Sequence, residues 1–294
     1  MIETGPAQAG AVESPLVTDA YRACRTLVQS HYENFMVASV FTPRRLRRYM
    51  WALYAYARTV DDIGDEASGD RRRLLDEAER AVRDCAQGRR TSPLFIALGD
   101  TIDRCRLPLE PFLALIEANR RDQDPTPFQT FAELASYCQG SAQTVGRLVL
   151  RIFGYDDPEL DTLSDHTTTA LQLVNFYQDL RVDAHRGRLY LPLDEMERFG
   201  VRREDLVAES MTRPLAALLR YSYDRAWGLF EAGRPLERRV SRALARQLAL
   251  YRGGGMAVLS GLEAHLARGR LDRPALSTSR KIRLLLRVLV GGAA

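Results

Sequence analysis

The chain has 294 residues, of which 46% are hydrophobic, and this is enough apolar material for a sizeable core at the upper end of single-domain size. The formal net charge is only +4, so no global field points to nucleic acid and we expect no nucleic-acid partner. Four cysteines without C-x-x-C spacing argue against a zinc site or a disulfide framework, and they favour a reducing compartment.

Membrane and targeting signals are weak. No apolar h-region follows Met1, and no run approaches the ~18–20 apolar residues that cross a bilayer, so we expect a cytoplasmic protein. Residues 279–290, "SRKIRLLLRVLV", are basic and amphipathic. This segment could make a peripheral contact with the anionic inner membrane, and a terminal core helix is the alternative.

Helical periodicity dominates the chain after a tail at residues 1–15, which we expect to be disordered. We therefore predict an all-α protein with one domain over residues 16–294. Thr42 before Pro43 predicts an N-cap, and the glycine-rich run "RGGGMAV" at residues 252–258 predicts a helix break. The predicted helices lie at residues 42–66, 70–88, 92–107, 108–122, 130–155 and 160–183, in a short piece within 185–201, and at 204–209, 214–232, 235–251, 255–268 and 278–290.

The most apolar of these helices ends in a group of acids, "ALYAYARTVDDIGDE" at residues 52–66. At 100° per residue, four polar side chains fall within about 60° of arc on one face. They are Tyr54, Arg58, Asp61 and Asp65. Asp62 and Glu66 form a competing pair with the same spacing, one step around the helix, and spacing alone does not choose between the pairs.

A second helix repeats the pattern in "LQLVNFYQDLRVD" at residues 171–183, with one polar stripe within about 80° of arc. A solvated helix face is the alternative explanation, but such a face usually mixes acids with compensating Lys or Arg. Oxygen ligands without His or Cys suit Mg²⁺, which is commonly shared with substrate phosphates. The stripe consists of Gln172, Asn175, Asp179 and Asp183.

The pattern R-x-x-D-D-x-x-D from Arg58 and the pattern Q-x-x-N-x-x-x-D-x-x-x-D from Gln172 together resemble the squalene/phytoene synthase family. The resemblance extends over roughly residues 20–290. It is strengthened by "YC" at 137–138, "TVG" at 144–146 and "GRLYLP" at 187–192. Within the family, the segments "HYENFMVAS" at 31–39 and "GRLVLRIFGYDDPEL" at 146–160 are most similar to the hydroxysqualene synthases of bacterial hopanoid pathways.

The resemblance implies an isoprenoid-synthase-type helical fold around a central cavity, with the two acidic helices facing each other. It selects two Mg²⁺-binding pairs, Asp61 with Asp65 and Asp179 with Asp183. It also implies a prenyl diphosphate substrate, either presqualene or farnesyl diphosphate.

The chemistry of diphosphate ionisation suggests further roles. Arginines clamp phosphate oxygens and tyrosines donate to them, while an apolar, aromatic lining protects a carbocation from premature quenching. The phosphate candidates are Arg58, Arg188, Tyr54, Tyr190 and His31, beside the substrate-binding candidates Gln172 and Asn175. The lining candidates, for each of which plain core packing is the alternative, are Phe35, Tyr137, Val145, Leu148, Leu171 and Phe176, with Gly146 admitting substrate close to the backbone.

Gln178 departs from the many family members that carry Arg before the third Asp, and it agrees with the hydroxysqualene group. We therefore predict Mg²⁺-dependent ionisation of presqualene diphosphate followed by capture of water, with Gln178 holding that water or merely packing. The rival is a head-to-head condensing enzyme that makes presqualene diphosphate, squalene or phytoene. A non-catalytic assembly factor is disfavoured by the intact Asp pairs. No G-x-G-x-x-G motif occurs, so a Rossmann-type NADPH site is unsupported.

Overall fold

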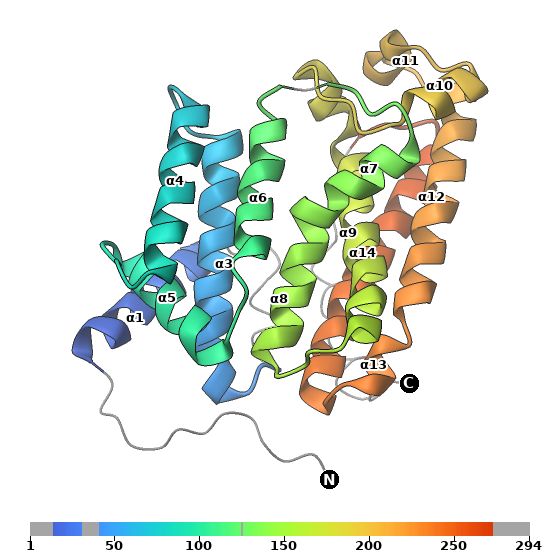
Figure 1. The fold of residues 1–294 in the computed structure, drawn as a ribbon. Helices are drawn as coiled ribbons and strands as arrows, with labels where there is room; N and C mark the ends of the chain where they lie inside the picture. The colour runs from blue at the N-terminus through green and yellow to red at the C-terminus, as the bar shows by residue number, and fades with distance from the viewer. Residues whose placement is uncertain (1–13, 31–40, 125, 273–294) are drawn as a thin grey trace. The chain divides into compact units, whose positions relative to one another are not determined.

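The structure is a computed structural model, and it describes residues 14–30, 41–124 and 126–272 (Figure 1). Every regular element in these three ranges is helical, so the prediction of an all-α protein is confirmed. None of the helices described is long and apolar enough to cross a membrane. Expectations for His31, Phe35 and the helix at 278–290 lie outside the described residues. The helices form two compact units, and the expectation of one domain stays a prediction.

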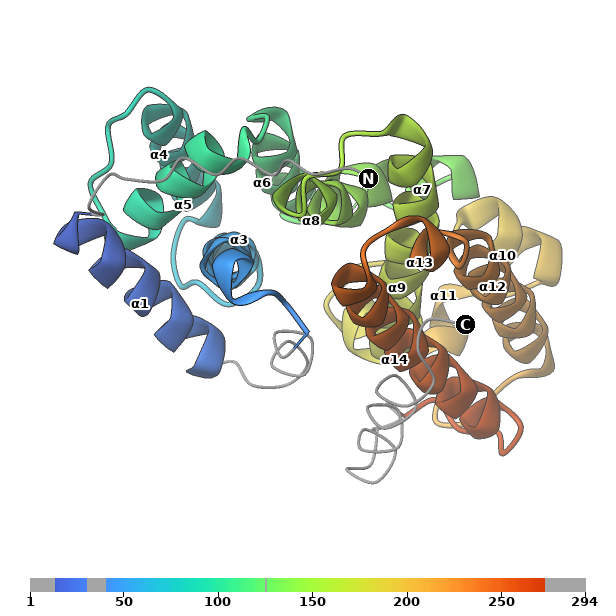
Figure 2. The same ribbon diagram turned by 90° about the horizontal axis from the view of Figure 1, so that it is seen from below.

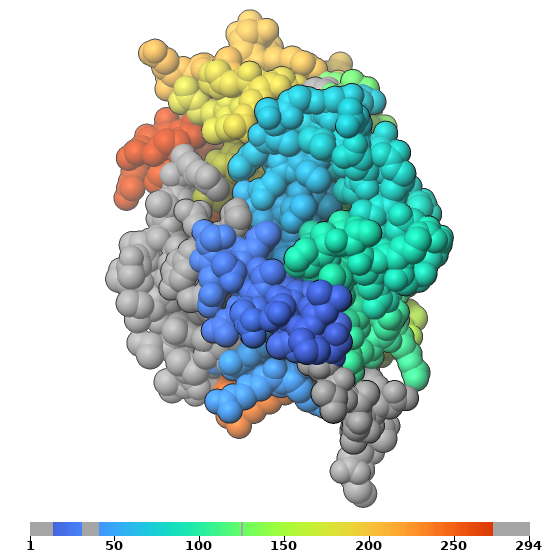
Figure 3. Space-filling view, turned by 90° about the vertical axis from the view of Figure 1, so that its left-hand side faces the viewer, coloured from blue at the N-terminus to red at the C-terminus, as the bar shows by residue number. Residues whose placement is uncertain are grey.

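The first unit comprises Met1–Gln123 and Thr144–Asp161. Its central helix is α3, which packs against α1, α4, α5 and α6 and also contacts α8. Figure 2 shows α3 end-on among these helices, and Figure 3 shows α1 and α5 lying against each other on one face of this unit. Aromatic contacts fix α6 onto α3. The helices are α1 (Pro15–Ser30), α3 (Arg44–Asp65), α4 (Arg71–Ala86), α5 (Pro93–Cys105), α6 (Glu110–Arg121) and α8 (Thr144–Ile152).

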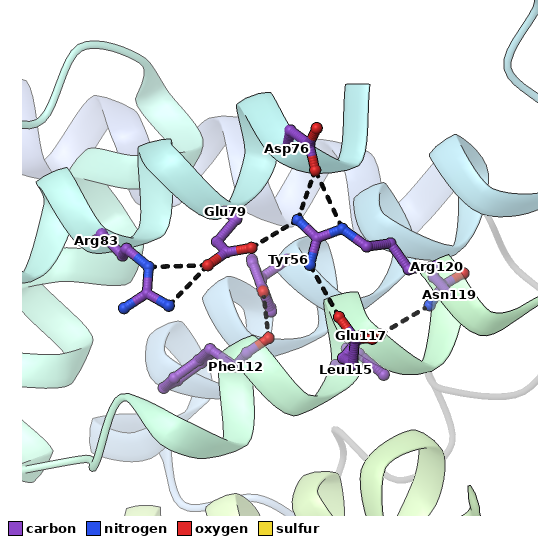
Figure 4. A network of polar contacts seen from close by, with 9 residues as sticks. All are labelled: Tyr56, Asp76, Glu79, Arg83, Phe112, Leu115, Glu117, Asn119 and Arg120. Atoms are coloured by element: carbon purple, nitrogen blue, oxygen red, sulfur yellow. Dashed lines mark hydrogen bonds and ion pairs between the residues drawn. The ribbon is translucent and has the colours of Figure 1, made fainter. Parts of the chain in front are cut away.

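The contact between α3 and α6 combines packing with a buried hydrogen bond. The rings of Tyr56 and Phe112 meet edge-to-face at 5.3 Å between centroids. The Tyr56 hydroxyl donates to the Phe112 carbonyl at 2.7 Å, so a fully buried phenol keeps its hydrogen-bond partner (Figure 4). This contact fixes the distance between the two helices one turn before the acidic end of α3.

The start of α3 corrects a prediction. Pro43 occupies the N-cap position without a side-chain capping bond, and the helix begins at Arg44. Thr42 is buried and lies one residue too early to cap, and its carbonyl accepts a hydrogen bond from Arg47 Nε at 2.9 Å. The prediction of Thr42 as N-cap is therefore wrong, because Pro43 takes the extended cap conformation itself.

The second unit comprises Asp124–Gln143 and Thr162–Ala294. Its core gathers buried side chains of α9, α12 and α14, including Leu173, Phe230 and Leu259. A five-residue π-helical turn, η1, follows α7 directly. The elements are α7 (Phe131–Cys138), η1 (Gln139–Gln143), α10 (Leu193–Phe199), α11 (Arg203–Val207), α12 (Arg213–Gly233), α13 (Leu236–Arg239) and α14 (Arg242–Leu266), together with α9 (Pro158–His185), which starts in the first unit.

The glycine-rich run at 252–258 does not break a helix, contrary to the prediction. α14 continues through it, because tight packing outweighs the low helix propensity of glycine. A Cβ on Gly255 would lie 2.6 Å from both Leu171 Cδ2 and Phe230 Cζ, so the small residue admits its neighbours. The predicted continuous helix at 235–251 is also wrong. The chain turns between α13 and α14, where Ser241 caps α14 by accepting from Leu244 N.

Candidate functional site

The acidic end of α3, defined here as residues 61–66, contains both candidate carboxylate pairs. Arg58 Nη2 lies 2.6 Å from Asp62 Oδ1 and 3.1 Å from Glu66 Oε1. The second pair, Asp62 with Glu66, therefore has a cation of its own on the same helix. The choice of Asp61 and Asp65 as the pair that would receive an external cation stays a prediction of the family resemblance. The contact of Arg58 with a diphosphate stays a prediction.

Asp61 is the carboxylate with the most perturbed environment in this group. Its pKa is raised from 3.8 to about 6, chiefly by burial, while a hydrogen bond from Asn119 lowers it and the negative charge of Asp65 raises it. Asp61 is nevertheless exposed to solvent, so water still screens its charge, and the direction of the shift follows from the protein atoms crowded around the carboxyl. A carboxylate disfavoured in its charged form, beside a second carboxylate, is the environment that a divalent cation would relieve.

Tyr54 and Arg58 belong to the same stripe, as the helical spacing predicts. Burial raises the pKa of Tyr54, while the nearby Arg58 lowers it and Asp61 raises it. The three groups thus lie within electrostatic reach along one face of α3. Tyr54 is half-buried and lies about two helical turns before Asp61.

Asn119 in the last turn of α6 and Gln123 just after this helix support the acidic end, and neither was singled out from the sequence. Asn119 Nδ2 donates to Asp61 Oδ1 at 3.4 Å, and Gln123 Nε2 donates to the Gly64 carbonyl at 3.0 Å. Arg71 Nη1 adds a bond to the same carbonyl at 3.1 Å. In the sequence, Asn119 is a polar residue whose helical spacing from Phe112 places it on the apolar face of α6, and a polar residue on such a face is the signal that could have identified it.

The polar stripe of α9 is also separated from its apolar face. Asn175 is exposed, and the other stripe residues are partly buried. The opposite side is buried at Leu173, Val174, Phe176, Tyr177 and Leu180. Val182, in the last turn of α9, is 49% exposed, whereas Ala184 in the same turn packs against the core. The stripe residues are Gln172, Asn175, Asp179 and Asp183, and Gln178 lies partly buried next to Asp179.

The loop after α9 returns two further candidates to this helix. Gly187 has φ +78°, a left-handed conformation that suits glycine and reverses the chain. The amide of Arg188 then donates to the Asp183 carbonyl at 2.9 Å. This turn keeps Arg188 at the acidic end of α9 and lets Tyr190 fold back onto Phe176.

An aromatic cluster forms where that loop meets α7 and α9. The rings of Phe176 and Tyr190 stack at 3.9 Å between centroids with an interplanar angle of 2°. Tyr137 lies 6.2 Å from Phe176 and 6.0 Å from Tyr190, and Phe128 closes the group at 5.4 Å from Tyr137. Three sequence candidates, Tyr137, Phe176 and Tyr190, are thus brought together, and their π-faces suit a cation or an isoprenoid chain.

The π-helical turn η1 adds a polar tie to this region of the second unit. Gln143 Nε2 donates to Thr169 Oγ1 of α9 at 2.9 Å. Turns of this kind occur frequently at functional sites. Val145, Gly146 and Leu148, also predicted to line a cavity, lie on α8 and belong to the first unit. The expectation that the two acidic helices face each other stays a prediction.

The donor set fits a magnesium ion in its chemistry. Within the described ranges, no group of three or more His, Cys, Asp or Glu side chains is gathered as a metal site. Mg²⁺ in phosphate-binding sites is usually held by one or two protein carboxylates together with substrate phosphates and water. Asp61, with its raised pKa and its neighbour Asp65, fits that kind of partial coordination. Asp179 and Asp183 would supply the equivalent pair on α9.

Comparison with known proteins identifies relatives across most of the chain. A family model described as squalene/phytoene synthase matches residues 28–280. The chain is 30% identical over 267 residues to the 15-cis-phytoene synthase of Synechocystis sp. (85% of this chain, 78% of the relative). It is 32% identical over 245 residues to the phytoene synthase of Mycobacterium tuberculosis (80% of each).

Solved structures agree with the fold. The crystal structure of squalene synthase HpnC from Alicyclobacillus acidocaldarius has a TM-score of 0.82 and 47% identity, and the match covers 85% of this chain and 95% of that one. A dehydrosqualene synthase crystallised with a ligand has a TM-score of 0.86 at 24% identity, covers 93% and 96% of the two chains, and bears on the fold alone. The prediction of an isoprenoid-synthase-type helical fold is confirmed.

Proposed function

Because this chain belongs to the squalene/phytoene synthase family, whose members act on prenyl diphosphates, we propose that it ionises presqualene diphosphate and adds water to the cation. The products are hydroxysqualene and pyrophosphate. The similarity to the HpnC structure, 47% identical and described as a squalene synthase, against about 30% for the phytoene synthases, supports the carbon number, and Gln178 before Asp179 supports the capture of water. A thirty-carbon substrate is therefore favoured over a forty-carbon one.

The reaction begins with loss of pyrophosphate. The C–O bond breaks heterolytically, and the electron pair leaves with the diphosphate oxygen. Arg188 would bind phosphate oxygens, and so would Arg58 once its guanidinium turns away from Asp62 and Glu66. The hydroxyls of Tyr54 and Tyr190 would donate to the same oxygens. Mg²⁺, when held by Asp61, Asp65, Asp179 and Asp183, would supply positive charge that stabilises the leaving group.

The cation must survive until water reaches it. The stacked rings of Phe176 and Tyr190, with Tyr137 beside them, would provide aromatic surface that stabilises the cation. Water then forms a C–O bond with the cation and loses one proton to solvent or to the departing pyrophosphate. Gln178, partly buried next to Asp179, would hold the water with its neutral amide.

Head-to-head condensation is the second candidate, and the names of the relatives favour it. Several curated relatives are phytoene synthases, and HpnC is described as a squalene synthase. In that case the same arginines, tyrosines and carboxylates would bind two allylic diphosphates. Carbon–carbon bond formation to presqualene diphosphate would release one pyrophosphate. A second would leave on conversion to squalene, with hydride from NADPH, and in the forty-carbon series to phytoene, with loss of a proton.

The two candidates are separated by substrate and by the origin of oxygen. Purified protein is incubated with Mg²⁺ and either presqualene diphosphate or farnesyl diphosphate in ¹⁸O-water, with and without NADPH. We expect presqualene diphosphate to give a labelled alcohol in both cases. Squalene as the main product with NADPH, or an unlabelled alcohol, would overturn the water-trapping proposal. Conversion of farnesyl diphosphate with no turnover of presqualene diphosphate would move the protein to the condensing class.

The role of Gln178 has its own comparison. Gln178→Arg places a cation beside a proposed metal ligand and near the developing carbocation, whereas Gln178→Leu removes only the polar amide. We expect both variants to lower the yield of alcohol and Gln178→Arg to lower it more. Stabilisation by Mg²⁺ and pyrophosphate, measured by thermal melting, should change less than turnover does.

A further inference from the structure

Asn119 is a buried polar residue, 8% exposed, at the end of α6. Its Nδ2 donates to Asp61 Oδ1 at 3.4 Å and to the Leu115 carbonyl at 3.1 Å. We propose that Asn119 is a positioning residue that fixes the Asp61 carboxylate for binding a divalent cation. This inference rests on the proposed function, in which Asp61 is a ligand of Mg²⁺.

The orientation of the amide follows from its partners. Both contacts of Nδ2 are acceptors, one a carboxylate and one a carbonyl of the same helix, so the NH₂ group must face them. A flipped amide would place an oxygen against two oxygens. With both N–H groups engaged, the side chain of Asn119 cannot rotate without losing a bond in a buried position, where an unsatisfied polar group costs about 1–3 kcal/mol.

Gly64 makes the room that this amide needs. A Cβ added at Gly64 would lie 2.2 Å from Asn119 Oδ1 and 3.0 Å from its Cγ. Only glycine therefore lets the two helices approach with the amide between them. The position of Asn119 is thus set by α3 on one side and by its own helix on the other.

Two further bonds fix the backbone on which Asp61 lies. Gln123 Nε2 donates to the Gly64 carbonyl at 3.0 Å and to the Asn119 carbonyl at 2.9 Å, so it links both partners. Arg71 Nη1 donates to the Gly64 carbonyl at 3.1 Å. The last turn of α3 is therefore held from α4 and from α6. A carboxylate held on a fixed backbone, with one oxygen already oriented, loses less freedom when it binds a cation.

The neighbouring residue provides a matched control. Arg120 points to α4, where it binds Asp76 at 2.8 Å and Glu79 at 2.5 Å, as Figure 4 shows beside Asn119. Arg120→Ala weakens the attachment of α6 to α4 without removing a contact of Asp61. A general loosening of α6 would therefore appear in this variant, and loss of carboxylate positioning would not.

The test measures cation binding apart from turnover. Wild type, Asn119→Leu, Asn119→Ala, Arg120→Ala and Asp61→Asn are melted over a series of Mg²⁺ concentrations at fixed pyrophosphate. Asn119→Leu keeps the volume without the donor, and Asn119→Ala serves if the first variant does not fold. We expect the Asn119 variants to need about 10–100-fold more Mg²⁺ for half of the full stabilisation, as is typical for residues that support a metal ligand.

The outcomes separate this inference from the function on which it rests. Arg120→Ala should melt lower without ligand and keep the wild-type Mg²⁺ midpoint. If Asp61→Asn abolishes the stabilisation and the Asn119 variants keep the wild-type midpoint, the positioning role is refuted and the proposed function stands. If Asp61→Asn itself keeps the wild-type response, Asp61 is not a ligand, and both the metal assignment and the positioning role are refuted.

Discussion

Gly64→Ala is expected to destabilise the protein, although the same change usually stabilises a helix. Gly64 lies inside α3, where alanine is intrinsically favoured by about 1 kcal/mol. The added methyl group would lie 2.2 Å from Asn119 Oδ1, closer than a carbon and an oxygen can approach. Asn119 would have to move, and its bond to Asp61 would be lost.

The opposing contributions can be compared. Overpacking a well-packed site costs about 1–3 kcal/mol. Loss of a hydrogen bond by a buried amide costs about 1 kcal/mol more. Against the helix-propensity gain of about 1 kcal/mol, the net effect is a loss of about 1–3 kcal/mol in the free energy of unfolding.

Gly228 is a matched control in the interior of α12. No heavy atom lies within 4 Å of a Cβ built there, so Gly228→Ala should be stabilising by about 1 kcal/mol through helix propensity alone. Both variants are compared with wild type by urea denaturation, with the slope of the transition checked for constancy. The opposite signs expected for one chemical change test the packing argument directly.

A double variant assigns the clash. In Gly64→Ala/Asn119→Ala the amide is gone, and the nearest remaining atom of residue 119 is Cβ at 3.3 Å, tight but tolerable. Gly64→Ala should therefore cost less free energy of unfolding in the Asn119→Ala background than in wild type. The two substitutions are then coupled. Equal stabilisation by Gly64→Ala and Gly228→Ala, or strict additivity in the double variant, would refute the reasoning.

The remaining predictions concern charge. Because the pKa of Asp61 is raised from 3.8 to about 6, the folded state binds the proton more tightly, and its contribution to stability falls as pH rises through that window. Asp61→Asn should therefore raise the melting temperature at pH 7.5, and the melting temperature of this variant should fall less between pH 4 and pH 6 than that of wild type. Calorimetry over this pH range measures both effects, and a pH profile equal to that of wild type contradicts the prediction. Arg252 Nε binds buried Glu237 at 2.6 Å, so Arg252→Met should lower the free energy of unfolding, measured by urea denaturation, by about 3–5 kcal/mol. Adding Glu237→Gln to this variant should restore part of the lost free energy, because no charge is then left buried without its partner. Burial raises the pKa of all four cysteines, to about 12 for Cys138, so thiol reagents at pH 8 should label them slowly until urea is added, and rapid native labelling would disprove it.

Sequence periodicity was sufficient for most of the helices and for the two polar stripes, because both follow from a repeat of 3.6 residues within one segment, but it did not give the division between α13 and α14. It could not supply Asn119 as a partner of Asp61, since that contact joins two helices 58 residues apart in the chain. The pairing of Arg58 with Asp62 and Glu66 depends on side-chain conformation, which spacing does not determine. The first is a contact between two helices and the second is a side-chain conformation within one helix, and neither follows from the periodicity of a single segment.

Glycine shows why local rules gave mixed results. Gly187 has positive φ and ends a helix, as turn rules predict. Gly64 and Gly255 have helical neighbours on both sides and persist because another side chain occupies the place of a Cβ. The same residue type thus marks a turn in one place and a close helix contact in two others. Only the packing partners, which the sequence does not name, distinguish these cases.

The acidic end of α3 now has a physical explanation. Carboxylates at the C-terminus of a helix oppose its dipole, at a cost of about 0.3–1 kcal/mol each. The structure offsets part of that cost with Arg58, which binds Asp62 and Glu66, and with Arg71, which donates to carbonyls of the last turn. Asp61 still has a pKa raised by burial and by Asp65. A helix end of this charge, with its backbone held by Arg71 and Gln123, would suit the cation proposed above. Binding of that cation would then release the stored repulsion without reorganising the helix.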